Sequence, residues 1–106
     1  MIIAKFYKNR ENRLLGFEIT GHAGYDDFGN DIVCASVSSA AMLTCNAATD
    51  IFCLDARVQV AENSVMLKLD SDESGEGDKL VLSLMVHLSM LSEDYPGCIT
   101  VKDVLK

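Results

Sequence analysis

The residues best suited to chemistry are a cysteine and a histidine joined by a short glycine-containing segment. His22 follows a predicted strand, and Cys34 lies in the first turn of a predicted helix. The nucleophilic form of cysteine is the thiolate, and a helix N-terminus or a neighbouring histidinium lowers the pKa of a thiol from its ordinary value of about 8.5. If the intervening loop folds back, His22 and Cys34 come within reach as a base and a nucleophile.

Each of these side chains also has a simpler interpretation. A cysteine is by default a small buried side chain. Asp31, directly before the helix, is explained as an N-cap that accepts hydrogen bonds from unpaired backbone N–H groups. Asp26, Asp27 and Asp31 could bind a metal with His22, but their spacing matches no ligand pattern, so no metal site is predicted.

The other three cysteines are interpreted as packing residues. Cys34 and Cys45 lie on the helix predicted over residues 32–52, and Cys53 directly follows its last residue. At the rise of a helix, their separations of eleven and eight residues correspond to roughly 16 and 12 Å along the axis. Cysteines in a disulfide have Cα atoms within about 7 Å, so these three cannot pair with one another. Cys98 is the fourth, and no C-x-x-C motif suggests zinc or redox chemistry.

The elements that must position the candidate site follow from hydrophobic periodicity and turn residues. Strands are predicted over residues 2–7, 14–20, 56–61, 64–70 and 98–104, with a loop over residues 21–30. A second helix follows the helix at 32–52, with Asp78 as its N-cap and one leucine stripe, formed by Leu80, Leu84, Leu88 and Leu91. The order ββαββαβ predicts a single α+β domain over residues 1–106, an antiparallel or mixed sheet with two helices packed on it.

Composition excludes several classes of protein. The 106 residues are 49% hydrophobic, which is too apolar for a disordered chain. Nine Lys and Arg against sixteen Asp and Glu give a net charge of −7, which argues against direct nucleic-acid binding and favours a cationic partner. Residues 1–10 lack a signal peptide, and the apolar run at 80–91 is too short to span a membrane, so a cytoplasmic protein without membrane contact is expected.

Two segments resemble the signature of a known family. They are residues 21–23, Gly-His-Ala, and residues 29–38, Gly-Asn-Asp-Ile-Val-Cys-Ala-Ser-Val-Ser. Together with the length and the order of elements, they resemble the ribosomal-processing cysteine proteases, the Prp family. The resemblance implies a homodimeric endopeptidase without a cofactor. It also implies a substrate: the N-terminal extension of a large-subunit ribosomal protein, which is removed by a cut that follows aromatic residues.

The resemblance also implies roles for individual residues. Cys34 would be the nucleophile, and His22 the general base and then the acid to the leaving amine. Asp31 would help to position the site. Ser38, one turn after Cys34, would lie on the same helix face. From the residues alone, Gly21, before the histidine, would let the backbone turn sharply or approach closely.

Further parts of the site are predicted from the residues themselves. Backbone N–H groups at the start of the helix, above all those after Cys34, would donate to the oxyanion of a tetrahedral intermediate. Tyr25 and Phe28 would form apolar walls for aromatic substrate side chains.

Two other functions compete with proteolysis. One is a non-catalytic acidic dimer that binds a basic ribosomal protein, which would need neither Cys34 nor His22. The other is a redox-sensing thiol, which needs a resolving cysteine, and Cys45 lies about three helical turns from Cys34. The Cys–His pair therefore favours the protease.

Overall fold

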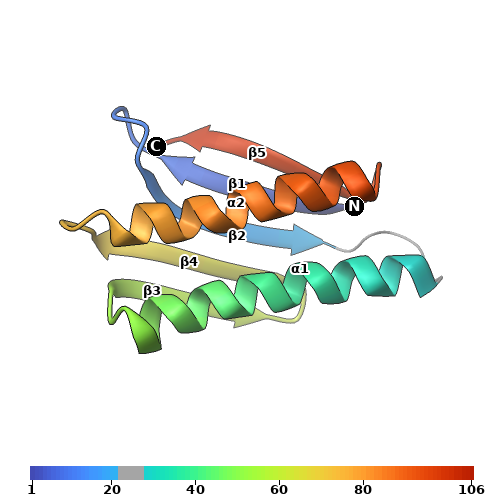
Figure 1. Cartoon of the computed structure of the whole chain (residues 1–106), viewed down its shortest axis with the longest axis horizontal. Helices are drawn as coiled ribbons and strands as arrows, with labels where there is room; N and C mark the ends of the chain where they lie inside the picture. Colours follow the sequence, from blue (N-terminus) through green and yellow to red (C-terminus); the bar gives the residue numbers. More distant parts are fainter. Residues whose placement is uncertain (22–27) are drawn as a thin grey trace.

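Within residues 1–21 and 28–106, which the structure describes, the chain forms a five-stranded sheet with two long helices on one face (Figure 1). The structure is a computed structural model, and for residues 28–31 it describes the backbone only. The strands are Ile2–Lys8 (β1), Leu14–Gly21 (β2), Asp55–Ala61 (β3), Ser64–Ser71 (β4) and Ile99–Leu105 (β5). The helices are Phe28–Asn46 (α1), the π-helical Ala47–Ile51 (η1) that continues it, and Glu76–Asp94 (α2). The α+β class and the order predicted from the sequence are confirmed.

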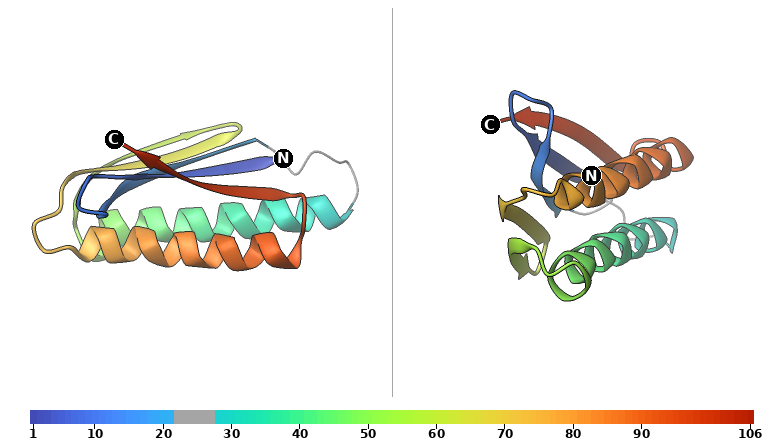
Figure 2. Two further views of the ribbon diagram at one scale, coloured as in Figure 1. Left: turned by 90° about the horizontal axis from the view of Figure 1, so that it is seen from above. Right: turned by 60° about the vertical axis from the view of Figure 1, so that its left-hand side comes forward.

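The sheet is mixed, with the strand order β3-β4-β2-β1-β5. The two hairpins, β1–β2 and β3–β4, are joined by antiparallel pairing of β2 with β4, and β5 adds parallel to β1. The helix α1 connects β2 to β3, and α2 connects β4 to β5, so each helix is a crossover between strands of the same direction. The two crossovers run in opposite directions across the sheet from oppositely directed strands. Right-handed connections therefore place both helices on one face, as Figure 2 shows.

The core lies between this face and the helices. Alternate residues of β1 point inward, and its Phe6 lies opposite Phe17 of β2, with the ring centroids 6.0 Å apart. The inward side chains of α1 recur every three or four residues: Val33, Val37, Ala41 and Cys45, followed by Ala48 in η1. Burial of each larger apolar side chain stabilises the fold by roughly 1.5–3 kcal/mol.

The first helix begins earlier than the sequence suggests. Residues 28–30, expected in a loop, are helical, and Asp31 is the fourth residue of α1. The prediction that Asp31 is the N-cap is therefore wrong. The positive end of the helix dipole stabilises an aspartate throughout the first turn. An aspartate inside the first turn is therefore favoured for the same electrostatic reason as one at the N-cap.

Among the described helices, one is long and apolar enough to cross a membrane, and it is this one. The window is Ile32–Ile51, and it passes by length and composition alone. The apolar run considered in the sequence analysis, at residues 80–91, is too short to span a membrane. A helix that packs against a sheet passes the same test, and one side of Ile32–Ile51 is the core stripe described above. The window is weak evidence for a membrane span.

Candidate active site

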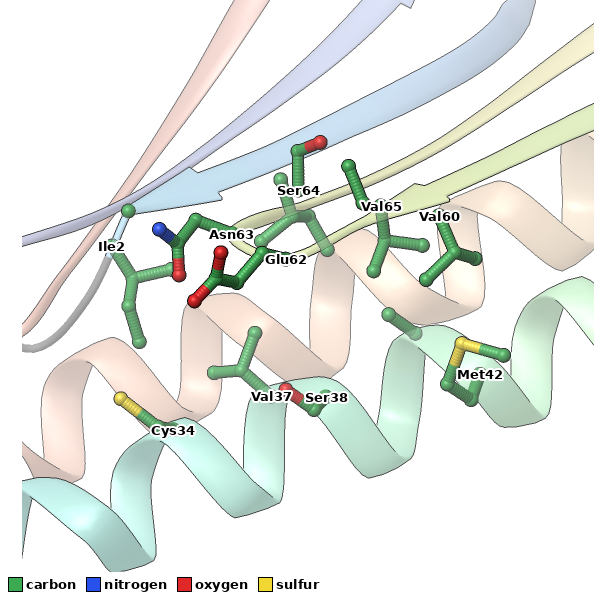
Figure 3. A pocket seen from close by; sticks show the side chains of 14 residues that line it. Ile2, Cys34, Val37, Ser38, Met42, Val60, Glu62, Asn63, Ser64 and Val65 are labelled. Atoms are coloured by element: carbon green, nitrogen blue, oxygen red, sulfur yellow. The ribbon is translucent and has the colours of Figure 1, made fainter.

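Cys34 lies at one end of a cavity between α1 and the β3–β4 hairpin (Figure 3). The cavity has a volume of about 380 Å³, large enough for one or two side chains of a bound peptide. Its walls are mostly apolar, formed by Ile2, Ile19, Val37, Ala41, Met42, Val60, Ala61 and Val65. Polar groups come from Cys34, Ser38, Glu62, Asn63 and Ser64, and Gly21 completes the lining.

One face of α1 supplies a row of side chains to this cavity. Cys34, Ser38 and Met42 are spaced four residues apart, so they follow one another along the same face of the helix. Cys34 is half-buried and Ser38 is exposed. A thiol, a hydroxyl and an apolar side chain therefore line the cavity in that order.

The end of β2 contributes Gly21 to the lining of the cavity. Its φ of +91° lies in the left-handed region, and a Cβ at this position would collide with the carbonyl oxygen of Met1. The Gly21 N–H donates to the carbonyl of Asn63, at 3.2 Å, which ties the tip of the β3–β4 hairpin to the end of β2. The N-terminus, β2 and the hairpin thus meet beside Cys34.

The remaining predicted site residues are described only in part. His22 and Tyr25 lie outside the described residues. Phe28 and Asp31 lie in α1, but their side chains are not described. Of the predicted site residues, the structure therefore brings three into one cavity, and these are Gly21, Cys34 and Ser38.

The position of Cys34 within α1 changes two chemical expectations. Cys34 is the seventh residue of the helix, in its second turn, whereas the favourable effect of the helix dipole falls off within the first turn. Each backbone N–H from the fifth residue of an α-helix onward donates to the carbonyl four residues earlier. The N–H groups after Cys34 are therefore committed to the helix, and the prediction that they stabilise an oxyanion is wrong.

The other cysteines have three different environments. Cys45 is buried in the core, and burial raises the pKa of its thiol, which disfavours the thiolate that a resolving cysteine requires. Cys53 is exposed, so its prediction as a packing residue is wrong; it follows η1 with a φ of +52°, beyond the end of the buried stripe. Cys98 is half-buried, and all four cysteines are thiols rather than disulfides.

Sequence reasoning missed the part of the cavity that comes from the second hairpin. Val60 and Val65 form an apolar wall near its turn, and Glu62 and Asn63 form the turn itself. The turn is recognisable in the sequence, but its place beside Cys34 depends on the pairing of β4 with β2, which no local pattern reveals. Among the described residues, no three His, Cys, Asp or Glu side chains converge as metal ligands would.

A half-buried thiol at the end of an apolar cleft is an arrangement that a thiol hydrolase can use to bind an extended chain. The comparisons with known proteins specify the class. The chain belongs to the family of the cysteine protease Prp, whose family model matches residues 1–100, and it is a cysteine protease.

Individual relatives extend over nearly the whole chain. The ribosomal processing cysteine protease Prp of Bacillus subtilis (strain 168) is 26% identical over 101 residues, covering 90% of each chain. The crystal structure of SMU.848 from Streptococcus mutans has a TM-score of 0.84 at 28% identity, covering 100% of this chain and 96% of its own. The essential ribosomal processing protease Prp from S. aureus, in complex with a covalently linked product peptide, has a TM-score of 0.88 at 21% identity. This match covers 98% of the chain described here and 100% of the S. aureus chain.

Proposed function

We propose that this cysteine protease removes a short N-terminal extension from a large-subunit ribosomal protein, with Cys34 as nucleophile and His22 as general base. The observation that carries the proposal is the cavity that contains both Cys34 and Gly21, because His22 is the next residue of the chain after Gly21. The B. subtilis relative is described as a ribosomal processing protease, which supports the choice of substrate.

The proposed reaction proceeds through an acyl-enzyme. His22 takes the proton of the Cys34 thiol, and the sulfur forms a bond to the carbonyl carbon of the scissile peptide. The C–N bond breaks as His22 returns the proton to the leaving amine, which departs as the new N-terminus of the mature protein. A water molecule, deprotonated by His22, then attacks the thioester, releasing the extension as a carboxylic acid and restoring the thiol.

The supporting residues keep the roles that the family resemblance implies for Ser38 and Asp31 and that the residues themselves predict for Tyr25 and Phe28. In the proposal, Ser38 is a polar group one turn from Cys34, about 6 Å further along the helix axis, and it can hydrogen-bond a substrate in the cavity. Asp31 positions the site, and Tyr25 and Phe28 add apolar walls for aromatic substrate side chains. The apolar residues of the cavity favour an extension with bulky apolar side chains next to the cut.

The proposal includes a dimer that acts in the cytoplasm. Homodimers are implied by the family resemblance, and exposed apolar side chains on the outer surface of both helices support a self-association surface. A ribosomal protein is available for processing in the cytoplasm, where it is made. The net charge of −7 suits a strongly basic protein substrate.

The proposal is tested by incubating the protein with the extended ribosomal protein of the same organism and following its mass. We expect loss of the N-terminal extension, which Cys34→Ala abolishes while the variant keeps its fold and its binding of substrate. The matched control is Cys53→Ala, which removes an exposed thiol outside the cavity and leaves cleavage intact.

Two outcomes would contradict the proposal. Cleavage by Cys34→Ala at a rate near that of the wild type would exclude Cys34 as the nucleophile. Binding of the ribosomal protein by the wild type without any cleavage would favour the non-catalytic binding module instead.

A further inference from the structure

The cavity beside Cys34 has an uneven distribution of charge. Of the described residues that line it, Glu62 is the only one with a formal charge. Glu62 lies at the turn of the β3–β4 hairpin, and its side chain extends from that turn toward the α1 side of the cavity (Figure 3). The carbonyl of the neighbouring Asn63 accepts a hydrogen bond from the N–H of Gly21, so the turn is held at the same end of the cavity as Cys34.

The Glu62 carboxylate is available to a ligand. Among the described residues, the ion pairs are Lys8–Asp103, Arg13–Asp72 and Arg57–Asp70, and none of them includes Glu62. The basic residue of β3 is already committed, because Arg57 and Asp70 approach to 2.8 Å. No described residue of the cavity lining is a lysine or an arginine.

The surroundings of Glu62 determine which ligands it favours. Next to it in the cavity wall are the apolar side chains of Val60, which is exposed, and Val65, which is half-buried. Glu62 is itself exposed, so it attracts a cation as a charge at the rim of the cavity does. A lysine or arginine of a bound peptide could lay its apolar stem along this wall and place its charge at the carboxylate. A peptide with a carboxylate at the same point would be repelled.

We propose that Glu62 is a specificity-determining residue, which selects peptides that carry a lysine or arginine close to the scissile bond. The inference rests on the proposed function only in that a peptide binds in the cavity beside Cys34. It adds the charge that the peptide must carry and the residue that recognises this charge.

The test uses fluorogenic peptides taken from the extension and cleavage site of the ribosomal protein, identical except at one position. That position carries either lysine or the uncharged norleucine, and it is moved from four residues before the cut to four residues after it. At one or two neighbouring positions, we expect the wild type to prefer lysine by about fivefold in kcat/KM, since a partly exposed charge pair contributes up to about 1 kcal/mol. In Glu62→Gln this preference is lost.

Charge reversal separates recognition from a structural effect of the substitution. Glu62→Lys should prefer glutamate over glutamine at the same position of the peptide, which a merely damaged hairpin would not produce. The matched control is Glu73→Gln, which changes the net charge by the same amount but lies beyond the far end of β4, about 25 Å away along the strand. This control should keep the wild-type preference for lysine.

A binding measurement keeps the inference testable if no peptide is cleaved. Dye-labelled lysine and norleucine peptides are titrated with Cys34→Ala and with Cys34→Ala/Glu62→Gln, and fluorescence anisotropy reports the Kd. Absence of cleavage by the wild type would overturn the proposed function, while a preference for the lysine peptide that depends on Glu62 would still support this inference. A lysine preference that is unchanged in Glu62→Gln, or equally reduced in Glu73→Gln, would overturn the inference.

Discussion

Three thiols of the chain, those of Cys34, Cys53 and Cys98, are at least partly accessible, and only Cys34 lies in the cavity. Cys34 is half-buried beside Gly21, and Cys53 is exposed at the end of η1. Access alone would therefore make Cys53 the more reactive. A faster reaction of Cys34 requires a base that removes its proton, and the chain offers His22 next to Gly21.

We expect iodoacetamide at neutral pH to modify Cys34 roughly tenfold faster than Cys53, because in the proposed function His22 takes the proton of the Cys34 thiol as its sulfur attacks. His22→Ala should slow the reaction of Cys34 and leave that of Cys53 unchanged, so Cys53 is the internal control. Peptide mapping by mass spectrometry at successive times gives both rates. Equal rates for the two thiols in the wild type would contradict activation by His22.

The buried thiol predicts how stability depends on pH. Burial raises the pKa of Cys45 above its ordinary value, so as the pH rises the unfolded chain loses this proton before the folded protein does. The stability that the protonated thiol contributes is constant below the unfolded pKa of about 8.5 and declines as the pH rises from there to the folded pKa.

We therefore expect the stability advantage of the wild type over Cys45→Ala to shrink between pH 8 and pH 10. At neutral pH the variant should be less stable by about 1–2 kcal/mol because it leaves a small cavity. Urea unfolding under reducing conditions, at steps of one pH unit, measures the difference. The pKa of Tyr7 is also raised, by desolvation and then by the charge and the hydrogen bond of Glu18, but both proteins share this effect. A difference that is independent of pH would contradict the prediction.

Gly21 provides a test of backbone geometry at the site. Gly21→Ala should destabilise the fold by about 2–3 kcal/mol, because the new Cβ adds a collision with the Met1 carbonyl to the strain of a positive φ. Gly97 is the matched control, since its φ is +83° but a Cβ there would meet nothing within 4 Å. Gly97→Ala should cost only about 1 kcal/mol in the free energy of unfolding. Equal losses of unfolding free energy in the two variants, measured by urea unfolding, would show that the collision with the Met1 carbonyl contributes nothing.

At the scale of elements, periodicity predicted the strands and helices well but not their first turns. Both helices have an aspartate before an apolar run, at Asp31 and Asp78, and in both the aspartate lies inside the first turn. The reason is visible at α2, where the side chain of Asp72 accepts hydrogen bonds from the N–H groups of Gly77 and Asp78, each at 2.9 Å. Asp78 instead accepts from the N–H of Leu14, at 2.8 Å, which a local pattern cannot show.

The capping of α2 can be tested with a pair of substitutions. Asp72→Ala should lower the free energy of unfolding by about 1–2 kcal/mol, because two N–H groups lose their acceptor and Arg13 loses its ion-pair partner. The matched control is Ser74→Ala, which removes an exposed hydroxyl that accepts a hydrogen bond from the backbone N–H of Glu76. This variant should lose less than about 0.5 kcal/mol of unfolding free energy. Urea unfolding of both variants gives the comparison. A loss in Ser74→Ala as large as that in Asp72→Ala would show that the cap contributes little.

At the scale of the whole molecule, the site is assembled from segments whose proximity is set by sheet order. The sequence predicted Cys34 and Ser38 on one helix face, because a four-residue spacing is local information. It could not place Glu62 beside them, since that depends on the antiparallel pairing of β2 with β4, and strands far apart in the chain have no local signal for their register. The residue types predicted the nucleophile and the base, the family resemblance predicted the substrate, and the fold determines the cavity walls.

The outer surface of the helix layer is unusually apolar for a surface that faces water. Side chains more than two-fifths exposed include Ile32 and Leu43 on α1 and Leu82, Val86 and Met90 on α2. Between the two helices lies a groove of about 470 Å³ that is lined by small and apolar residues, including Leu43, and by His87. An exposed apolar patch of this kind is typical of a protein–protein contact, and a second copy of the chain offers the same apolar surface.

The proposed homodimer can therefore be tested on this surface. We expect the wild type to sediment at about twice the 11.6 kDa mass of the chain. The double variant Leu43→Glu/Val86→Glu should sediment as a monomer. The reason is that each protomer would bury two uncompensated carboxylates at the interface. Glutamate keeps a good helix propensity, and circular dichroism verifies that the variant is folded. The control is Leu105→Glu, which changes an equally exposed leucine at the end of β5, away from the helix layer, and should remain dimeric. A monomeric wild type would contradict the dimer itself, while a dimer that survives both helix substitutions would place the contact on another surface.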